Sequence, residues 1–175
     1  MRFILMAFVK VRPTKPDEIP VCDISALLDG SNPLSVAREL RAASTGLGFI
    51  YIKGHGIPQH IINNARYEAY KFFRSTKDQK STTPITNEHR GWIDSGGAMM
   101  DDGAKTDLKE SFLWGFDSLG QSDHSLRGQN IWPTNNSDMK IATMEYFKSV
   151  HKIARHLMRG FALGLDLDQN FFLQT

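Results

Sequence analysis

Six histidines are the residues of this sequence best suited to metal chemistry. A mononuclear non-haem iron site needs two imidazoles and one carboxylate on one face, with the remaining coordination positions left open. In the commonest sequence form of such a site, a histidine and the carboxylate stand two residues apart, on the same side of one strand. Two residues after the six histidines stand Ile57, Ile62, Gly91, Leu126, Ile153 and Met158. Because none of these is Asp or Glu, the sequence contains no such pair.

Other catalytic patterns are also missing. His151 and His156 are five residues apart, so on a helix they would point about 140° apart rather than share a zinc ion. Gly54 and Gly56 lack the later glycine of a dinucleotide fingerprint, and no phosphate-binding lysine loop or G-x-S-x-G motif occurs. The sequence therefore gives no support to a zinc, nucleotide-binding or serine hydrolase site.

Three further residues could bear chemistry, and each has a simpler interpretation. The single cysteine, Cys22, has no activating neighbour in the sequence and is expected to be a small buried strand residue. His55 follows a predicted strand and is expected to hydrogen-bond nearby backbone in a turn. His124 stands beside Asp123 and is expected in a solvated loop. We therefore assign no catalytic residue and no metal ligand from the residues themselves.

The composition limits the classes of function. Of the 175 residues, 41% are hydrophobic and 23% charged, a balance typical of one soluble globular domain. The net charge of +2 comes from dispersed Lys and Arg, which gives no reason to expect nucleic acid or an anionic membrane as a partner. One cysteine excludes an internal disulfide framework and fits a reducing cytoplasm. We expect a cytoplasmic protein without nucleic-acid or membrane partners.

Residues 1–16 are expected to form a leader of uncertain structure. The apolar run over 3–9 is too short to span a bilayer, and basic residues follow it without a signal-peptide cleavage site. Pro13 and Pro16 separate this leader from the organised chain. We predict that the organised chain is one domain over residues 17–175.

The organised part is expected to begin with two strand–helix pairs. The first strand is predicted over 19–25 (IPVCDIS), and Asn32 suits the N-cap of a helix whose apolar residues recur up to Leu47. A second, buried strand is predicted over 48–54 (GFIYIKG). A second helix with one apolar side follows the turn at Pro58.

The remaining chain divides into a loop region and a long helix. Glycines interrupt the apolar runs over 75–136, so we expect loops there with one short strand around 109–115. Apolar residues then keep helical spacing, which predicts a long helix over about 137–165 that Gly164 and the acidic residues after it close. The expected fold class is α+β, with short strands, several helices and the long C-terminal helix packing across them.

Five phrases of the sequence, in order, resemble the isopenicillin N synthase-like oxygenases, the iron(II)- and 2-oxoglutarate-dependent dioxygenases. The resemblance is to their N-terminal domain and covers about residues 19–173. The phrases are IPVCDIS, GFIYIKGHGIP (48–58), HRGW (89–92), DLKESF (107–112) and GQNIWP (128–133). ALGLD (162–166) with Phe171 and Phe172 is similar to the end of the long helix that follows in the family.

The resemblance implies the N-terminal part of an oxygenase fold whose catalytic double-stranded β-helix, or jelly-roll barrel, is mostly absent. In the family, the H-x-D pair, the distal histidine and the R-x-S segment that holds 2-oxoglutarate all lie in that barrel. Residue by residue, the resemblance transfers no iron ligand and no 2-oxoglutarate anchor to this chain. It offers Arg90 and Trp92 as substrate contacts, because this segment reaches over the barrel mouth in some relatives. A surface arginine and a core-edge tryptophan are the structural alternatives.

Two functions remain open. The first is the N-terminal scaffold portion of an oxidoreductase acting on an unknown small molecule, inactive as this isolated chain. Iron(II) and 2-oxoglutarate are then implied only for the full-length enzyme, and some relatives oxidise without 2-oxoglutarate. The second is a stand-alone, non-catalytic module that binds a partner through the surface a barrel would cover. The expected partner is the missing barrel or a second copy, and an apolar helix face left without its barrel favours the first function.

Overall fold

The computed structural model describes residues 15–97, 107–116 and 128–173, and the fold is α+β as expected. The strands form two two-stranded sheets, and the described ranges contain no closed barrel. No helix within these ranges has the length and apolar character needed to cross a membrane. Contacts divide the chain into two compact units. The single domain expected over 17–175 stays a prediction. Unit 1 comprises residues up to Gly56 and from Val150 onward, and unit 2 comprises residues 57–149.

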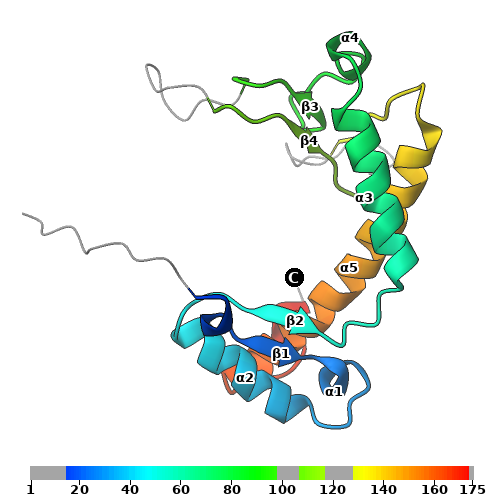
Figure 1. Cartoon of the computed structure of the whole chain (residues 1–175). Helices are drawn as coiled ribbons and strands as arrows, with labels where there is room; N and C mark the ends of the chain where they lie inside the picture. The colour runs from blue at the N-terminus through cyan, green and yellow to red at the C-terminus, as the bar shows by residue number, and fades with distance from the viewer. Residues whose placement is uncertain (1–14, 98–106, 117–127, 174–175) are drawn as a thin grey trace, which may run out of the picture. The chain divides into compact units, whose positions relative to one another are not determined.

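Unit 1 combines a small sheet with helix α2 and the second half of the long helix α5 (Figure 1). Its elements are η1 (Pro16–Glu18), β1 (Val21–Asp23), α1 (Ser25–Leu28), α2 (Pro33–Thr45), β2 (Tyr51–Lys53), the end of α5 (Ser137–Gly164) and η2 (Phe171–Leu173). The strands and α2 lie where the sequence predicts them. Asn32 caps α2 as expected, because its side chain accepts a hydrogen bond from Ser35 N at 3.3 Å. Helix α1 is not predicted, since one turn leaves no periodic pattern.

The strand pair of unit 1 has one covered face and one exposed face. β1 and β2 are parallel, and Val21 lies beside Tyr51 in the register. Successive side chains point to opposite faces of a strand. Cys22 is 2% exposed, whereas Val21 and Tyr51 are 57% and 59% exposed. The prediction of a buried strand over 48–54 is therefore wrong for this chain, because Tyr51 and Lys53 of β2 are exposed.

Helix α2 packs closely against the second half of α5 within unit 1. A Cβ atom at Gly160 would lie 2.8 Å from Leu40 Cδ1 and 3.0 Å from Leu27 Cδ2. A larger residue at this position would displace Leu27 of α1 and Leu40 of α2 from the core of unit 1. The long-helix prediction is confirmed, because α5 spans Ser137–Gly164. Its buried residues differ from the predicted apolar side, of which Ile141 is 66% exposed.

The long helix ends as a Schellman turn. Asp166 has a φ of 60°, and Leu167 N donates to Ala162 O at 2.9 Å. Arg41 Nη1 donates to Gly164 O at 2.8 Å and lies 3.1 Å from Asp166 Oδ2. The left-handed residue that ends the helix is therefore Asp166 rather than Gly164.

Unit 2 pairs helix α3 with the first half of α5 and adds a small antiparallel sheet (Figure 1). Its elements are α3 (Gln59–Phe73), α4 (Lys77–Lys80), β3 (Gly91–Ile93), β4 (Ser111–Leu113) and the start of α5. α3 follows Pro58 as predicted, and β4 confirms the strand expected around 109–115. α4 and β3 correct the expectation of loops over the rest of 75–136. Thr76 and Gln79 form a reciprocal capping box at the start of α4, and β3 begins at a glycine.

One aromatic cluster forms the core of unit 2. Its buried members are Phe72, Trp92, Phe112 and Met139, with Phe73 and Trp132 packed against them. Phe72 and Phe112 meet edge to face, with ring centroids 4.9 Å apart. Because these residues come from α3, β3, β4 and α5, the cluster joins all four elements.

Candidate functional site

Trp92, a predicted substrate contact, lies in the middle of β3 and is 5% exposed. Its ring belongs to the aromatic core of unit 2, and its Nε1 donates a hydrogen bond to Glu110 Oε2 at 2.8 Å. Lys80 Nζ lies 5.4 Å from the ring centroid, within cation–π range. Trp92 is thus a core residue of unit 2, and its contact with a substrate stays a prediction.

Lys80 and Glu110 form a largely buried ion pair beside Trp92. Their side chains are 11% and 28% exposed. Lys80 Nζ donates to Glu110 Oε1 at 2.9 Å and Oε2 at 2.7 Å, and to Phe73 O at 3.2 Å. An ammonium group has three N–H donors, so three acceptors satisfy it. This arrangement joins α4 to β4 and fixes the orientation of the Trp92 ring.

Arg90, the other predicted substrate contact, lies just before β3 and is 9% exposed. Its Nη1 donates to Glu88 O at 3.0 Å and His89 O at 3.1 Å. A Cβ atom at Gly115 would lie 2.6 Å from Arg90 Nη2, so the guanidinium packs closely on that glycine. Substrate contact by Arg90 also stays a prediction.

The glycine between Arg90 and Trp92 sets the local backbone. Gly91 has a φ of 113°, a conformation that residues with side chains rarely adopt. A Cβ atom there would lie 2.5 Å from Pro84 O, and Trp92 N donates to Thr83 O at 2.7 Å. The RGW phrase therefore needs its glycine for close approach of two backbones.

The GQNIWP phrase contributes to packing within unit 2 as well. Asn130 Oδ1 accepts from Gly115 N at 2.8 Å, and Asn130 Nδ2 donates to Gly115 O at 2.7 Å. The ring of Trp132 lies 5.8 Å from that of Phe112. The phrase therefore fastens the chain ahead of α5 to the end of β4.

The described ranges hold no group of three or more His, Cys, Asp or Glu side chains that could bind a metal ion. His55 lies in the turn after β2, and His151 and His156 lie on α5. His124 falls outside the described residues. Two histidines and a carboxylate that converge, as iron(II) requires, are thus not found in these ranges. The residues described do not fit an iron centre, and no reaction step through iron can be assigned to them.

Cys22 is buried in β1, as expected. Burial, and after it the nearby carboxylates of Glu39 and Asp23, together raise the pKa of its thiol to about 12. At neutral pH the thiol is therefore protonated, which makes Cys22 a poor nucleophile.

The Lys80–Glu110 pair is the part of this arrangement that the sequence does not predict. Lys80 stands in a region without periodicity, and a separation of 30 residues divides the partners. Glu110 does stand in the DLKESF phrase, which is the one signal that could identify it. Spacing alone carries no information about contacts formed by folding of a loop region.

The sequence matches, over residues 19–135, the family described as non-haem dioxygenase in morphine synthesis N-terminal. It is 30% identical over 169 residues to homoarginine-6-hydroxylase of Glycine max, covering 88% of this chain and 50% of that protein. It is 26% identical over 165 residues to isopenicillin N synthase of Amycolatopsis lactamdurans, covering 89% of this chain and 50% of that protein.

Solved structures share this fold. A protein assigned to the 2OG-Fe(II) oxygenase family from Caulobacter crescentus gives a TM-score of 0.75 at 25% identity, covering 90% of this chain and 52% of that one. A full-length Neurospora crassa protein in complex with alpha-KG and thymine gives a TM-score of 0.70 at 25% identity, covering 91% and 52%. The chain therefore spans about half the length of the relatives it matches.

Proposed function

This chain belongs to the non-haem dioxygenase N-terminal family, and we propose that it is the N-terminal scaffold portion of an iron(II)- and 2-oxoglutarate-dependent oxygenase. The full-length enzyme would oxidise a small molecule in the cytoplasm. Iron(II) and 2-oxoglutarate would be held by the catalytic barrel, and this chain alone would be inactive.

The observation that carries the proposal is the use that unit 2 makes of the family phrases. Trp92 and Glu110 bond to each other, and Asn130 bonds to the backbone of Gly115. These side chains shape and stabilise the backbone of unit 2, and no metal-binding group accompanies them in the described ranges. Such residues suit a scaffold that supports chemistry located elsewhere.

The exposed face of the β1–β2 sheet supplies a contact surface for the proposed barrel. Val21, Tyr51 and the nearby Phe49 are 57%, 59% and 71% exposed. Parallel strands are ordinarily covered on both faces. On this face the exposed apolar side chains stand beside the Asp23–Lys53 ion pair. We place the barrel against this face, where it would cover all three side chains.

A chimera tests the scaffold proposal. This chain would replace the N-terminal half of the Glycine max homoarginine-6-hydroxylase, and a second chimera would use the corresponding half of the Amycolatopsis lactamdurans isopenicillin N synthase. We expect the first chimera to fold and to bind iron(II) at least as well as the second. If only the second chimera folds and binds iron(II), the scaffold proposal is wrong and a stand-alone module is favoured.

Point variants of the first chimera locate the contact. Tyr51→Asp should weaken folding of the chimera, because it places a charge under the barrel. Leu34→Asp is the matched control, since Leu34 of α2 is 53% exposed and lies outside the sheet. Equal effects of the two substitutions would exclude the sheet face as the barrel contact.

A further inference from the structure

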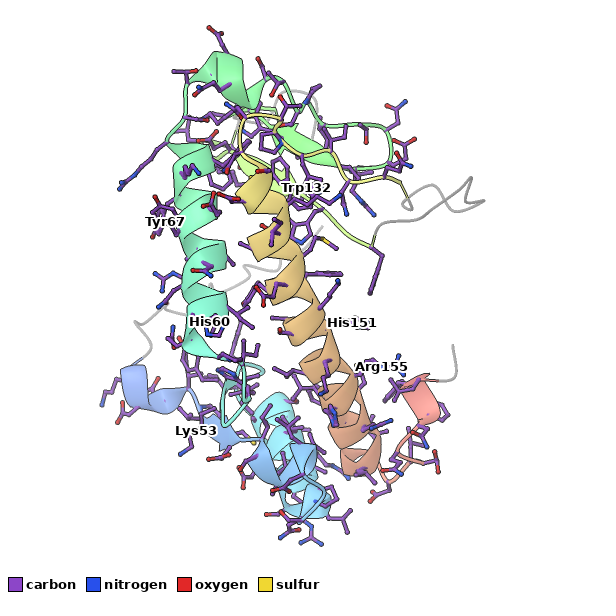
Figure 2. The ribbon with its side chains drawn as sticks, turned by 90° about the vertical axis from the view of Figure 1, so that its right-hand side faces the viewer. Lys53, His60, Tyr67, Trp132, His151 and Arg155 are labelled. Carbon is purple, nitrogen blue, oxygen red and sulfur yellow. The ribbon has the colours of Figure 1, made fainter. Side chains whose placement is uncertain are left out.

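A small polar pocket in unit 2 lies where the end of α3 meets the start of α5. Figure 2 shows these two helices side by side, with Trp132 just ahead of α5. The pocket has a volume of about 210 Å³ and is lined by Lys71, Phe72, Ser75, Gln79, Asn135 and Asn136. Sites for drug-sized molecules measure about 300–1,000 Å³, so this pocket suits a smaller ligand. The proposed scaffold role does not use it.

The charge of the pocket differs from that of its surroundings. The described residues that line it include one cation, Lys71, and no carboxylate. The neighbouring groove between the same two helices is lined by three carboxylates, those of Glu68, Asp138 and Glu145. Glu68 Oε2 lies 3.3 Å from Lys71 Nζ, but Glu68 lines that groove and not the pocket. The pocket is therefore the side of this helix contact that favours a negatively charged ligand.

Asn136 brings to the pocket a buried donor that lacks an acceptor. This residue is 8% exposed and immediately precedes α5, and its backbone O accepts from Met139 N at 3.3 Å. Its Oδ1 accepts from Lys71 Nζ at 3.1 Å, which identifies Nδ2 as the donor end of the amide. Within the part of the chain that the structure describes, Asn136 Nδ2 has no hydrogen-bond partner. Buried polar groups are ordinarily hydrogen-bonded, so this amide indicates an acceptor that belongs to a ligand of the pocket.

Two further donors line the same pocket. Lys71 Nζ donates to Asn136 and Glu68, and because an ammonium group has three N–H donors, one remains for another acceptor. Gln79 Oε1 accepts from Thr76 N at 3.1 Å, which leaves Nε2 of Gln79 as a donor. The first N–H groups of α5 have no partner within the helix, and the helix dipole gives this end a partial positive charge. A cation, amide donors and a helix N-terminus together are the groups that bind oxyanions.

We propose that this pocket binds a small oxyanion, either a phosphate or a carboxylate. One oxygen of the ligand accepts from Asn136 Nδ2, and its other oxygens accept from Lys71 Nζ and Gln79 Nε2. The ligand thereby joins α3, α4 and the start of α5. The site lies wholly within unit 2 and does not involve the exposed sheet face of unit 1. Its failure and the failure of the scaffold proposal are therefore separate results.

Titration of the purified chain with sodium phosphate tests the site. The side-chain amide signals of Asn136 in nuclear magnetic resonance spectra should shift and saturate. Thermal stability should rise with phosphate concentration, since a ligand that binds only the folded chain stabilises it. Sodium acetate forms a second arm, and the oxyanion that binds more tightly identifies the class of ligand. Sodium chloride at equal ionic strength is the control. No saturable shift in either arm, or the same shift with chloride, overturns the proposal.

Asn136→Asp tests the role of the buried donor. The substitution keeps the size of the side chain and an acceptor for Lys71 but replaces Nδ2 with an oxygen, so oxyanion binding should weaken about tenfold or more. Asn64→Asp is the matched control, because it makes the same change of charge on α3 and Asn64 lines the neighbouring groove. Circular dichroism verifies that both variants are folded. Equal affinities of the two variants for the oxyanion would contradict the assignment of Asn136 to the site.

Discussion

The two strand pairs of this chain are equal in length but differ in what covers them. β3 and β4 place Trp92 and Phe112 in an aromatic core, and the Lys80–Glu110 ion pair borders it. β1 and β2 have one covered face, and on the other Val21 and Tyr51 remain more than half exposed. The sheet of unit 2 is thus completed by its own unit, whereas that of unit 1 exposes a face on which Val21 and Tyr51 alternate with the Asp23–Lys53 ion pair.

This difference separates two roles for residues of one family domain. In unit 2, residues of the family phrases pack against the β3–β4 sheet, as Trp132 does, or hydrogen-bond beside it, as Asn130 does. In unit 1, the phrase GFIYIKGHGIP places Tyr51 on the exposed face of the sheet, where the described residues leave it 59% exposed. Changes in unit 2 should therefore destabilise the isolated chain, and changes on the exposed face of unit 1 should not.

The largest effect is expected for Phe112→Ala in unit 2. Removing a buried aromatic side chain leaves a cavity and costs about 3–5 kcal/mol of unfolding free energy. Urea denaturation monitored by tryptophan fluorescence measures it. Leu108→Ala is the control, because Leu108 is 93% exposed. Similar losses in the two variants would contradict the packed core of unit 2.

A smaller loss is expected for Lys80→Met. The substitution leaves the Glu110 carboxylate without its ammonium partner in a partly buried site, which costs about 2–3 kcal/mol. Lys77→Met is the matched control on the same helix, since its side chain is 74% exposed. We expect no measurable loss for the control, because an exposed pair is screened by water. Equal stability of both variants would show that the Lys80–Glu110 ion pair does not stabilise the folded chain.

In unit 1, the covered face is probed by the pH dependence of stability. The pKa of Cys22 is raised from 9.0 to about 12 in the folded chain, chiefly by burial. The unfolded chain therefore loses this proton first, and the stabilisation present below pH 9 is lost as the pH rises toward 12. Cys22 should contribute a loss of about 1–2 kcal/mol between pH 8 and pH 10. Cys22→Ala should show a shallower pH dependence, and an unchanged slope would mean that the thiol is accessible.

The smallest effect is expected for Tyr51→Ser on the exposed face of the same sheet. Replacing a side chain that is 59% exposed should change the unfolding free energy by about 0.5 kcal/mol or less. Thermal and urea denaturation of the isolated chain measure it. A loss comparable with that of Phe112→Ala would show that the exposed face is packed in solution. The two sheets would then not differ in how their faces are covered.

Local signals explain which parts of the fold the sequence predicts. Asn32 before a proline and a long apolar repeat after Ser137 mark helices through short-range chemistry, so α2 and α5 are predicted well. β3 is missed because Gly91 reads as a strand breaker, although its φ of 113° is what the close backbone approach requires. The exposure of Tyr51 is missed for another reason. Its sequence pattern indicates burial, but a pattern cannot say which molecule or segment does the covering.

The candidate site follows the same logic. Arg90 and Trp92 are identified by resemblance, and the resemblance does not reveal that both are buried in this chain. The Lys80–Glu110 pair depends on a contact between distant residues, for which neither helical nor strand periodicity provides a signal. The absence of a histidine–carboxylate pair at two-residue spacing, in contrast, can be read directly from the sequence.

Anaerobic iron(II) titration of the purified chain, with and without 2-oxoglutarate and followed by calorimetry, tests the central claim most directly. The full-length Glycine max relative is the positive control. We expect no stoichiometric iron binding by this chain and no oxygen uptake when air is admitted. Tight binding of one iron(II) per chain with 2-oxoglutarate-dependent oxygen uptake would contradict it.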